Sequence, residues 1–295
     1  MSEQVGIIGG GALGTLLMAR FAAAGLDVRA VVRSAPRRET LAQQLPSVAT
    51  AADCSILRDA RLAFLCVKAY DTRAVASALA DAGLRDLAIC SLQNGWGNLE
   101  ILAERLPEAP LLAGATSIGA YLDALGALHD STEGSTVIAP WRPADAPWAE
   151  RAVALLRQAG LGAETRPDAR AVLFRKLLLN SAVNPVTALA IRPNGALLDE
   201  PALLRIAERA ALEAARVGWR LNLLPRGFDP AGALRAILSE TRGNRSSMME
   251  DLARGRRTEI EEIEGAVVRL AGEAGEAVPI QRALLTLVRA AEGRT

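Results

Sequence analysis

Three polar residues recur every four positions in a stretch that is otherwise mostly hydrophobic, residues 173–185. They are Lys176, Asn180 and Asn184, and a helix would place them within an arc of about 80° on one side. One interpretation is a solvent-exposed face, although such faces usually carry Glu, Arg or Gln, and Asn is a poor helix former. The other is a substrate face, on which amides and an ammonium would stabilise and then protonate the alkoxide developing from a ketone. We favour the second interpretation, with Lys176 as the general acid.

Lysine is rare in this chain, because Lys68 and Lys176 are the only two lysines among 34 basic residues. Composition bias is one explanation for two isolated lysines. The other is that both positions need a compact ammonium, which at Lys176 can release a proton as an arginine cannot. The composition does not decide between these explanations.

A glycine-rich turn near the N-terminus has Gly9, Gly11 and Gly14 in G-x-G-x-x-G register. A buried strand precedes it, a helix follows, and another strand arrives within about 30 residues, which is the setting of a dinucleotide site. The backbone of such a turn approaches a pyrophosphate, which meets free N–H groups and the positive end of the helix dipole. The residues expected to bind the dinucleotide here are Gly9, Gly10, Gly11, Ala12, Leu13 and Gly14.

The end of the second predicted strand bears on which dinucleotide is bound. An acidic residue there would accept hydrogen bonds from the adenosine ribose of NAD. This chain instead has Arg33 and Ser34, with Arg37 and Arg38 close by. An arginine suits a 2′-phosphate, which an acid would repel, so the sequence favours NADP(H). The alternative is that Arg33 is a solvated loop residue.

Two further polar residues follow predicted strands. Lys68 comes directly after a strand at 62–67, and Asn94 follows one at 87–92. In a doubly wound sheet the carboxyl ends of the strands line the ligand crevice, so both residues are candidate ligand contacts.

The local sequence around Glu259 has a structural explanation. Thr258 and Glu261 match an S/T-x-x-E capping box, and Glu259 would then be an acid favoured in the first helical turn. The local sequence alone therefore predicts a structural role for Glu259, at the start of a helix.

Strand and helix patterns alternate in the first half of the chain, which predicts a parallel sheet covered by helices. Strands are expected at 5–8, 28–32, 62–67 and 87–92, helices at 14–24, 37–44, 71–80 and 98–105, further strands closing the domain at 111–113, 127–129 and 137–139, then a helix at 147–158 and a strand at 163–165.

Long helical patterns without clear strands follow Arg166, at 169–183, 202–217, 231–240, 247–254, 259–274 and 280–292. We therefore predict an α/β protein, with an N-terminal Rossmann-type doubly wound sheet in residues 1–166 and an all-helical C-terminal domain in residues 167–295.

Composition narrows the classes of function. The 295 residues carry a net charge of +1, which supplies no field for nucleic acid or an anionic membrane, so a small-molecule partner is expected. Three cysteines without C-x-x-C spacing and a single histidine argue against disulfide frameworks and histidine-rich zinc sites, and we expect no metal. No apolar run approaches the roughly 18 residues of a membrane helix. We expect a soluble, cytoplasmic protein, and its Ala- and Leu-rich helical domain is compatible with a homodimer.

Taken together, the motifs resemble the ketopantoate reductase (2-dehydropantoate 2-reductase) family over nearly the whole chain. The resemblance implies a Rossmann domain followed by a helical domain, with NADPH and a 2-oxo acid in the cleft between them. It is carried, in order, by Gly9–Gly14, the strand ending in Lys68, residues 92–95, Gly114–Ala120, Lys176 with Asn180 and Asn184-Pro185, residues 193–195, 246–256 and 258–260, and Gly265.

The resemblance also implies roles for individual residues. Lys176 would be the general acid, and Glu259 would gain a catalytic role near the nicotinamide and the substrate. Arg33 would bind the 2′-phosphate, and Lys68, Asn94 and Ala120 would line the nicotinamide side of the cofactor site. The substrate's polar partners would be Asn94, Asn180, Asn184, Asn194 and Ser247.

Two departures from the family pattern bear on the substrate. The family usually has an Asp and then an Asn-Gly where this chain has Glu261 and Glu264-Gly265, and Trp96 is bulky for its position. The expected activity is NADPH-dependent reduction of 2-dehydropantoate to pantoate. The alternatives are reduction of another 2-oxo acid and a non-catalytic NADP(H)-sensing protein, which would need no proton donor.

Overall fold

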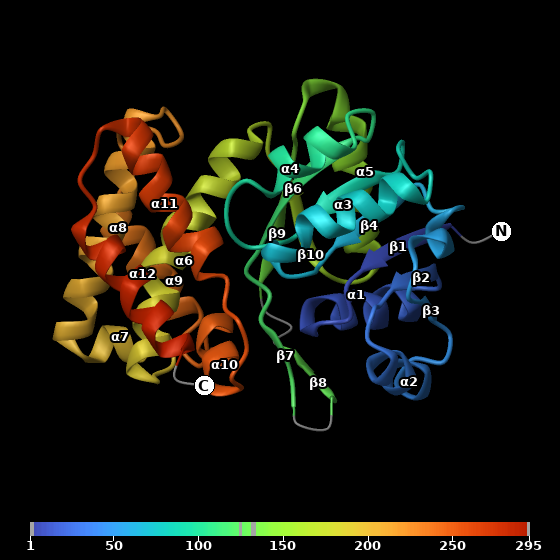
Figure 1. Ribbon diagram of the computed structural model, residues 1–295, viewed down its shortest axis with the longest axis horizontal. Helices are drawn as coiled ribbons and strands as arrows, with labels where there is room; N and C mark the ends of the chain where they lie inside the picture. The colour runs from blue at the N-terminus through green and yellow to red at the C-terminus, as the bar shows by residue number, and fades with distance from the viewer. Residues whose placement is uncertain (1–2, 124–125, 131–133, 294–295) are drawn as a thin grey trace. The chain divides into compact units, whose positions relative to one another are not determined.

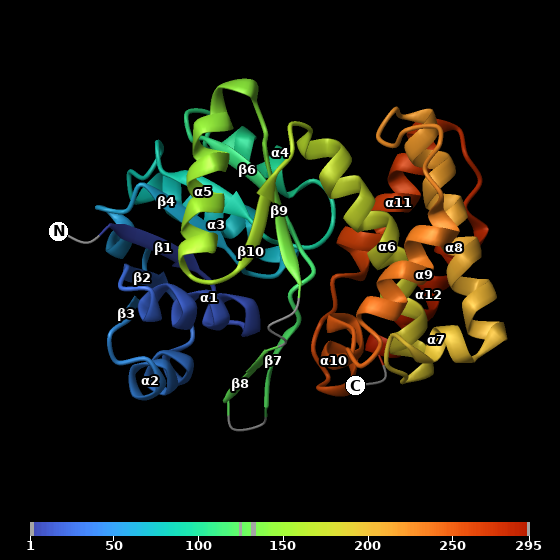
Figure 2. The same ribbon diagram turned by 180° about the vertical axis from the view of Figure 1, so that it is seen from behind.

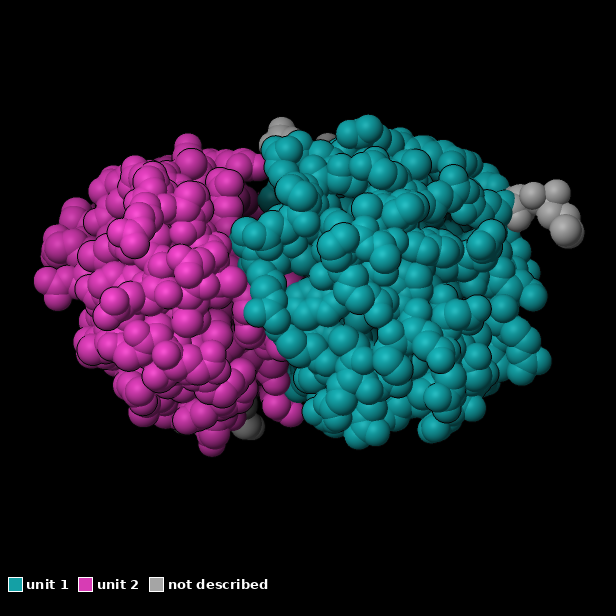
Figure 3. Space-filling view, turned by 90° about the horizontal axis from the view of Figure 1, so that it is seen from above, with its two compact units in different colours: residues 1–93, 98–172 teal, residues 94–97, 173–295 magenta. Residues whose placement is uncertain are grey.

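The computed structural model describes residues 3–123, 126–130 and 134–293. By their contacts, residues 1–93 and 98–172 form one compact unit, and residues 94–97 and 173–295 form a second; Figure 3 colours them separately. The short segment 94–97 thus belongs by its contacts to the second unit, although it follows a strand of the first. The domain boundary expected after residue 166 stays a prediction.

The first unit is built on an eight-stranded sheet with the strand order β3-β2-β1-β4-β5-β6-β9-β10. Neighbouring strands are parallel except β6 and β9, which are antiparallel. The order of the first six strands is that of a doubly wound dinucleotide-binding sheet, so the predicted fold class is confirmed. The strands are β1 (Gln4–Ile8), β2 (Asp27–Val31), β3 (Ala49–Ala51), β4 (Leu62–Leu65), β5 (Ala88–Ser91), β6 (Leu111–Thr116), β9 (Ser135–Pro140) and β10 (Gly162–Thr165).

Helices cover both faces of this sheet, which explains why its central strands are apolar throughout. In Figure 1, α3 and α4 lie in front of the sheet, and in Figure 2 α5 lies in front of the opposite face. The helices are α1 (Ala12–Ala23), α2 (Ala35–Gln44), α3 (Thr72–Asp81), α4 (Asn98–Arg105) and α5 (Ala146–Gln158), with short 3₁₀ helices η1 (Cys54–Leu57), η2 (Ala69–Asp71) and η3 (Pro143–Asp145).

The chain changes direction across the sheet between β1 and β4. Strand β1 pairs with β2 on one side and with β4 on the other. Loops leaving the carboxyl ends of these three strands therefore emerge at one edge, where a doubly wound sheet binds its ligand.

The first unit differs from the sequence-based expectation in several strands, since β7 (Ala120–Leu122) was not expected and β6 is three residues longer than expected. The strand expected at 127–129 does not join the main sheet, because β8 (Leu128–Asp130) pairs only with β7 in a separate two-stranded sheet. Strand β3 was not expected, because its three residues contain no apolar run and are ordered by pairing with β2.

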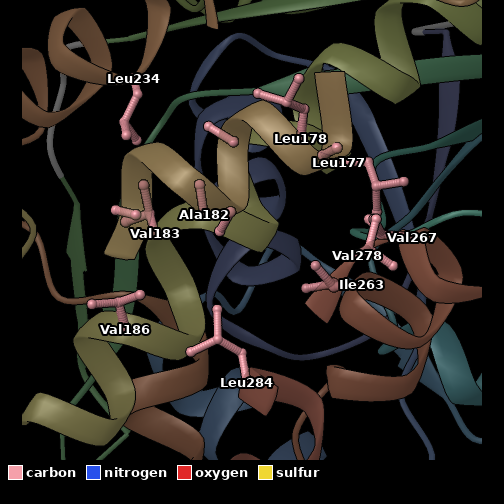
Figure 4. Packing of buried hydrophobic residues seen from close by; sticks show 14 of the residues in the cluster. Leu177, Leu178, Ala182, Val183, Val186, Leu234, Ile263, Val267, Val278 and Leu284 are labelled. Carbon is pink, nitrogen blue, oxygen red and sulfur yellow. The ribbon is translucent and has the colours of Figure 1, made fainter. Parts of the chain in front are cut away.

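The second unit is all-helical over the part of it that the structure describes, as predicted. Its apolar core surrounds α6, and Figure 4 shows Leu177, Leu178, Ala182 and Val183 of that helix facing side chains of the surrounding helices. The helices are α6 (Ala169–Ala190), α7 (Ala196–Asp199), α8 (Pro201–Arg220), α9 (Pro230–Glu240), α10 (Ser247–Ala253), α11 (Ile260–Ala274) and α12 (Pro279–Glu292).

Helix α6 is longer than expected, because it continues through Pro185 to Ala190 instead of ending near residue 183. Proline lacks an N–H and usually ends or kinks a helix. Here Val183 and Val186 are buried on either side of it, and the Thr187 hydroxyl donates to the carbonyl of Val183 at 2.9 Å. Tertiary packing thus outweighs the local proline signal.

The described residues contain neither a membrane-spanning helix nor a cluster of metal ligands. No helix there is both long enough and apolar enough to cross a membrane. No group of three or more His, Cys, Asp or Glu side chains in the same ranges could hold a metal ion.

Candidate active site

The glycine-rich turn is closed so tightly that the first and third glycines of its motif exclude a side chain. Gly9 has a φ of +120°, and a Cβ built on it would lie 2.9 Å from the carbonyl carbon of Cys66. A Cβ on Gly14 would lie 2.0 Å from the carbonyl oxygen of Gly9. These contacts hold the start of α1 against the ends of β1 and β4, so the first and third glycines of the motif are required by packing.

The second glycine of the motif, Gly11, faces the open space that a pyrophosphate requires. Gly11 is the N-cap of α1, it is exposed, and a Cβ built on it would meet nothing within 4 Å. No side chain makes a capping hydrogen bond to this helix. A helix N-terminus of this kind favours an anion, and residues 9–14 therefore fit a dinucleotide phosphate.

The arginines after β2 are engaged in different ways. Arg33 follows the strand on the surface, and its guanidinium donates to the Asp71 carboxylate at 2.6 Å. Arg37 instead donates to the Gly10 carbonyl at 3.0 Å and to the Thr15 hydroxyl at 2.7 Å, and burial lowers the pKa of its guanidinium. Arg38 donates to the carbonyl of Arg33 at 2.8 Å. Arg37 therefore braces the glycine-rich turn, and Arg38 braces the loop that follows β2.

Lys68 lies where the sequence predicts, just after β4, as the half-buried N-cap residue of η2. Its carbonyl accepts a hydrogen bond from the Gln93 side chain at 3.3 Å, and Gln93 also donates to the Thr72 hydroxyl at 2.8 Å. Gln93 thus ties together the loops that follow β4 and β5. Ala120, the remaining cofactor candidate of this unit, is half-buried at the start of β7.

In the second unit, Asn94 joins Asn180 to Glu259. The Asn180 side-chain amide donates to Asn94 Oδ1 at 3.4 Å, and Asn94 Nδ2 donates to Glu259 Oε2 at 3.1 Å. Glu259 is buried, with 4% of its surface exposed, while both Asn residues are half-buried. This chain of hydrogen bonds connects the predicted polar stripe of α6 to the start of α11.

The loop that carries Asn94 is held against the first turn of α11. Gly95 has a φ of +86°, and a Cβ built on it would lie 2.6 Å from the carbonyl oxygen of Glu262. The Trp96 backbone N–H donates to that carbonyl at 3.0 Å. The close approach explains how Asn94 reaches Glu259, which lies three residues before Glu262.

The polar stripe of α6 has the arrangement expected from its spacing. Lys176 and Asn180 are half-buried, one helical turn apart, and Asn184 is buried, with 7% of its surface exposed. The flanking Leu177, Leu178 and Ser181 are buried. Such a gradient from half-buried to buried is typical of a side of the helix that other side chains partly cover.

Two other predicted substrate residues, Asn194 and Ser247, occupy different environments. Asn194 is half-buried, and its amide donates to the Thr241 hydroxyl at 2.9 Å, while its Oδ1 is buried and has no hydrogen-bond partner among the described residues. Ser247 is exposed at the first position of α10. The neighbouring Ser246 is buried and caps that helix by accepting from Met249 N at 3.2 Å.

The capping box expected at the start of α11 is wrong. Glu259, not Thr258, is the N-cap residue, and the Thr258 N–H donates to the Glu292 carboxylate at 2.7 Å. Glu261 pairs instead with Arg289 of α12 at 2.7 Å, which lowers the pKa of its carboxyl. The carboxylates of Glu261 and Glu292 therefore connect the start of α11 to α12, whereas the carboxylate of Glu259 accepts from Asn94.

The positions that depart from the family pattern also have defined surroundings. Glu264 is fully buried, neither carboxyl oxygen has a partner among the described residues, and burial raises the pKa of this group well above its ordinary value. Trp96 is half-buried, with its ring edge-on to Phe174 at a centroid distance of 5.8 Å. Glu264 is therefore inaccessible to solvent, whereas Trp96 keeps part of its surface accessible.

Sequence reasoning missed Asp71, the partner of Arg33. Asp71 lies at the end of η2, three residues after Lys68, and the pair is separated by 38 positions in the chain. The sequence did contain an indication of this partner, because Asp71 is an acidic residue shortly after β4, the strand whose end contacts the glycine turn. Reading it required the order β2-β1-β4, which brings both loops to one edge of the sheet.

The fold and these geometries define a class of protein. A doubly wound sheet with a glycine-rich turn at the start of its first helix is characteristic of nicotinamide-dependent oxidoreductases, and the helical unit adds a lysine aligned with an amide–carboxyl chain. Such a set of groups suits reduction of a polar carbonyl compound.

Comparisons with known proteins identify the family. Residues 5–143 match the model described as "Ketopantoate reductase PanE/ApbA", and residues 168–292 match its C-terminal counterpart. A 2-dehydropantoate 2-reductase from Archaeoglobus fulgidus is 38% identical over 297 residues, which cover 98% of each chain. The chain therefore belongs to the ketopantoate reductase family and is a nicotinamide-dependent reductase.

Solved structures agree with this assignment. The crystal structure of a PanE/ApbA family ketopantoate reductase from Ralstonia eutropha JMP134 has a TM-score of 0.85 at 29% identity, and 99% of each chain is covered. A D-mandelate dehydrogenase solved with NADH and anilino(oxo)acetate has a TM-score of 0.87 at 21% identity over 99% of each chain, which shows a shared fold.

Proposed function

We propose that this protein uses NADPH to reduce the C2 ketone of 2-dehydropantoate to the alcohol of pantoate, as a step of pantothenate and coenzyme A biosynthesis. The observation that carries the proposal is the alignment of Lys176 with Asn180 on α6, with Asn180 bonded through Asn94 to the buried Glu259. The names of the relatives supply the substrate.

Each group in this set has a role in carbonyl reduction. The reduced nicotinamide, when bound, supplies the hydride. The Lys176 ammonium stabilises negative charge at the C2 oxygen and gives that oxygen a proton, which completes the alcohol. Asn180 positions the ketone or its neighbouring carboxylate through its amide. Asn94 fixes the orientation of Asn180 and holds Glu259 beside the reacting groups.

The remaining candidate residues complete the two binding functions. Residues 9–14 would hold the pyrophosphate, with Lys68 and Ala120 toward the nicotinamide. Asn184, Asn194 and Ser247 would contact the 2-oxo acid. Two observations support this assignment. Ser247 is exposed, and the Oδ1 of Asn194 has no partner among the described residues, so each side chain can make a hydrogen bond to a ligand.

The substrate is tested by supplying a panel of 2-oxo acids with NADPH and following the loss of absorbance of the reduced nicotinamide. We expect the highest kcat/KM with 2-dehydropantoate. A higher value for another 2-oxo acid would replace the substrate but keep the reaction. No turnover with any of them would contradict the enzymatic function and favour an NADP(H)-sensing protein.

The choice of NADPH is supported by Arg33, which follows β2 on the surface without an acidic residue at the ribose position of the strand end. Losing one charge-assisted phosphate contact costs about 1.5–3 kcal/mol, or roughly ten- to a hundredfold in affinity. The substitution Arg33→Ala should weaken NADPH binding by that factor and NADH binding far less, as measured by fluorescence titration. Equal weakening of both would contradict the choice of NADPH.

A further inference from the structure

The guanidinium proposed to bind the adenosine 2′-phosphate is engaged by an acid of the same unit. Arg33 donates to the Asp71 carboxylate at 2.6 Å, and 63% of the Arg33 side chain and 26% of the Asp71 side chain are exposed. A phosphate approaching Arg33 from solvent would therefore meet a guanidinium that already has an anionic partner.

The orientation of Asp71 is specific to this contact. Asp71 is the N-cap residue of α3, a position where an Asp side chain usually accepts a hydrogen bond from the helix backbone. Here it makes no side-chain cap hydrogen bond, and its carboxylate is directed to Arg33. Its own backbone N–H donates to the Lys68 carbonyl at 2.9 Å, which fixes Asp71 beside the cofactor-binding loop.

The neighbouring arginines cannot replace Arg33 at low cost. Arg37 holds the carbonyl of Gly10 and the hydroxyl of Thr15, and Arg38 holds the carbonyls of Val32 and Arg33. Turning either one toward a ligand would leave partly buried carbonyl groups without these donors. Arg33 is thus the arginine of this loop whose partner is an exchangeable surface side chain.

The two cofactors differ in how they interact with this pair. The 2′-phosphate of NADPH is an anion that needs the guanidinium and is repelled by a carboxylate beside it. The 2′-hydroxyl of NADH is neutral and can donate a hydrogen bond to a carboxylate. The same Asp71 therefore weakens the binding of one cofactor and not of the other.

We infer that Asp71 is a specificity-determining residue, which competes with the 2′-phosphate for Arg33 and so reduces the preference of this enzyme for NADPH over NADH. The inference rests on the proposed use of Arg33 for the 2′-phosphate. It predicts that the wild-type protein binds both reduced cofactors with a smaller difference in affinity than Arg33 alone would give.

The test measures Kd for NADPH and for NADH by fluorescence titration of the wild type and of Asp71→Asn, which keeps a residue suited to an N-cap. Because exposed ion pairs are worth about 0–1 kcal/mol, the variant should bind NADPH roughly two- to fivefold more tightly and NADH no more tightly than the wild type. The control is Asp81→Asn, which removes the same charge from the exposed far end of α3 and should change neither Kd.

A second arm introduces Asp71→Asn into the Arg33→Ala variant, where it should tighten NADPH binding less than it does in the protein that keeps Arg33, because only the direct repulsion of the 2′-phosphate is then relieved. Unchanged or weaker NADPH binding by Asp71→Asn alone would overturn the inference, as would equal tightening with and without Arg33. If Arg33→Ala does not change the ratio of the NADPH and NADH Kd values, the proposed cofactor choice fails instead. If Arg33→Ala lowers the preference for NADPH over NADH but Asp71→Asn has no effect, only the proposed role of Asp71 is contradicted.

Discussion

Asn94 is the residue on which the candidate substrate site depends most. Its Oδ1 accepts from Asn180 and its Nδ2 donates to Glu259, so both functional atoms of the amide have a partner and its orientation is fixed. Asn94 is 86 positions from Asn180 and 165 positions from Glu259 in the chain. No local pattern links them, which explains why the sequence did not predict the bonds between them and why Glu259 became a candidate only through the family resemblance.

The first residue-scale prediction concerns Asn180. Replacing it by Ala removes an amide that we place against the substrate, and a hydrogen bond to a charged group is worth about 1.5–3 kcal/mol. Asn180→Ala should therefore raise KM for the 2-oxo acid by roughly ten- to a hundredfold and leave the Kd for NADPH unchanged. Steady-state kinetics and cofactor titration measure the two effects. A fall in thermal midpoint with unchanged KM would show that Asn180 only supports the fold.

Ser247 and Ser246 provide a matched pair for separating substrate binding from structure. Ser247 is exposed, whereas Ser246 is buried, caps α10 and accepts from Thr187 at 2.8 Å. Ser247→Ala should raise KM for the 2-oxo acid without changing the thermal midpoint. Ser246→Ala should destabilise the protein by about 1 kcal/mol through the lost cap. An unchanged KM in Ser247→Ala would exclude this serine from the substrate site.

At the scale of elements, most strands of the central sheet were predicted to within two residues at each end because an apolar run marks their buried part, although β6 continues three residues beyond the expected 113. β1 and β4 follow this rule, whereas β3, with Ala49, Thr50 and Ala51, depends on pairing with β2. The end of α6 and the cap of α11 were wrong for a related reason. Pro185 and the Thr258–Glu261 spacing are local signals, and contacts from distant residues outweigh both.

Helix α11 carries two carboxyl groups with opposite effects on stability. Burial raises the pKa of Glu264, so the folded state binds its proton more tightly than the unfolded chain does. The stabilisation from that proton is complete below the ordinary glutamate pKa and is lost as the pH rises through the folded pKa. Pairing with Arg289 lowers the pKa of Glu261, whose contribution is present above the ordinary pKa and is lost as the pH falls.

The element-scale prediction follows from these signs. Glu264→Met removes a buried carboxyl without partners among the described residues, so it should raise the free energy of unfolding by about 1–3 kcal/mol at pH 7. The gain should shrink as the pH falls toward the ordinary glutamate pKa. Glu261→Gln should show a loss that shrinks in the same direction. Urea unfolding followed by circular dichroism across this pH range measures both, and a Glu264→Met gain independent of pH would contradict the prediction.

At the scale of the whole molecule, the candidate residues are divided between two compact units. Residues 9–14, Arg33 and Lys68 belong to the sheet-containing unit, and Lys176 and Glu259 belong to the helical one. The family resemblance implies an NADP-binding domain followed by a helical domain, and the roles of these residues stay predictions. It did not predict that residues 94–97 would join the helical unit, because that depends on the contact of Gly95 and Trp96 with Glu262. A homodimer and a cytoplasmic location stay predictions.

The central claim, that this reductase protonates its product through Lys176, is tested most directly by kcat of Lys176→Ala with saturating NADPH and 2-dehydropantoate. The control is Arg175→Ala, which removes the adjacent exposed cation of α6. A positioned general acid contributes about 10²- to 10⁴-fold, so Lys176→Ala should lose that factor in kcat while its Kd for NADPH is unchanged. Lys176→Arg should not restore activity, because guanidinium is too weak an acid. Near-wild-type kcat in Lys176→Ala would contradict the claim.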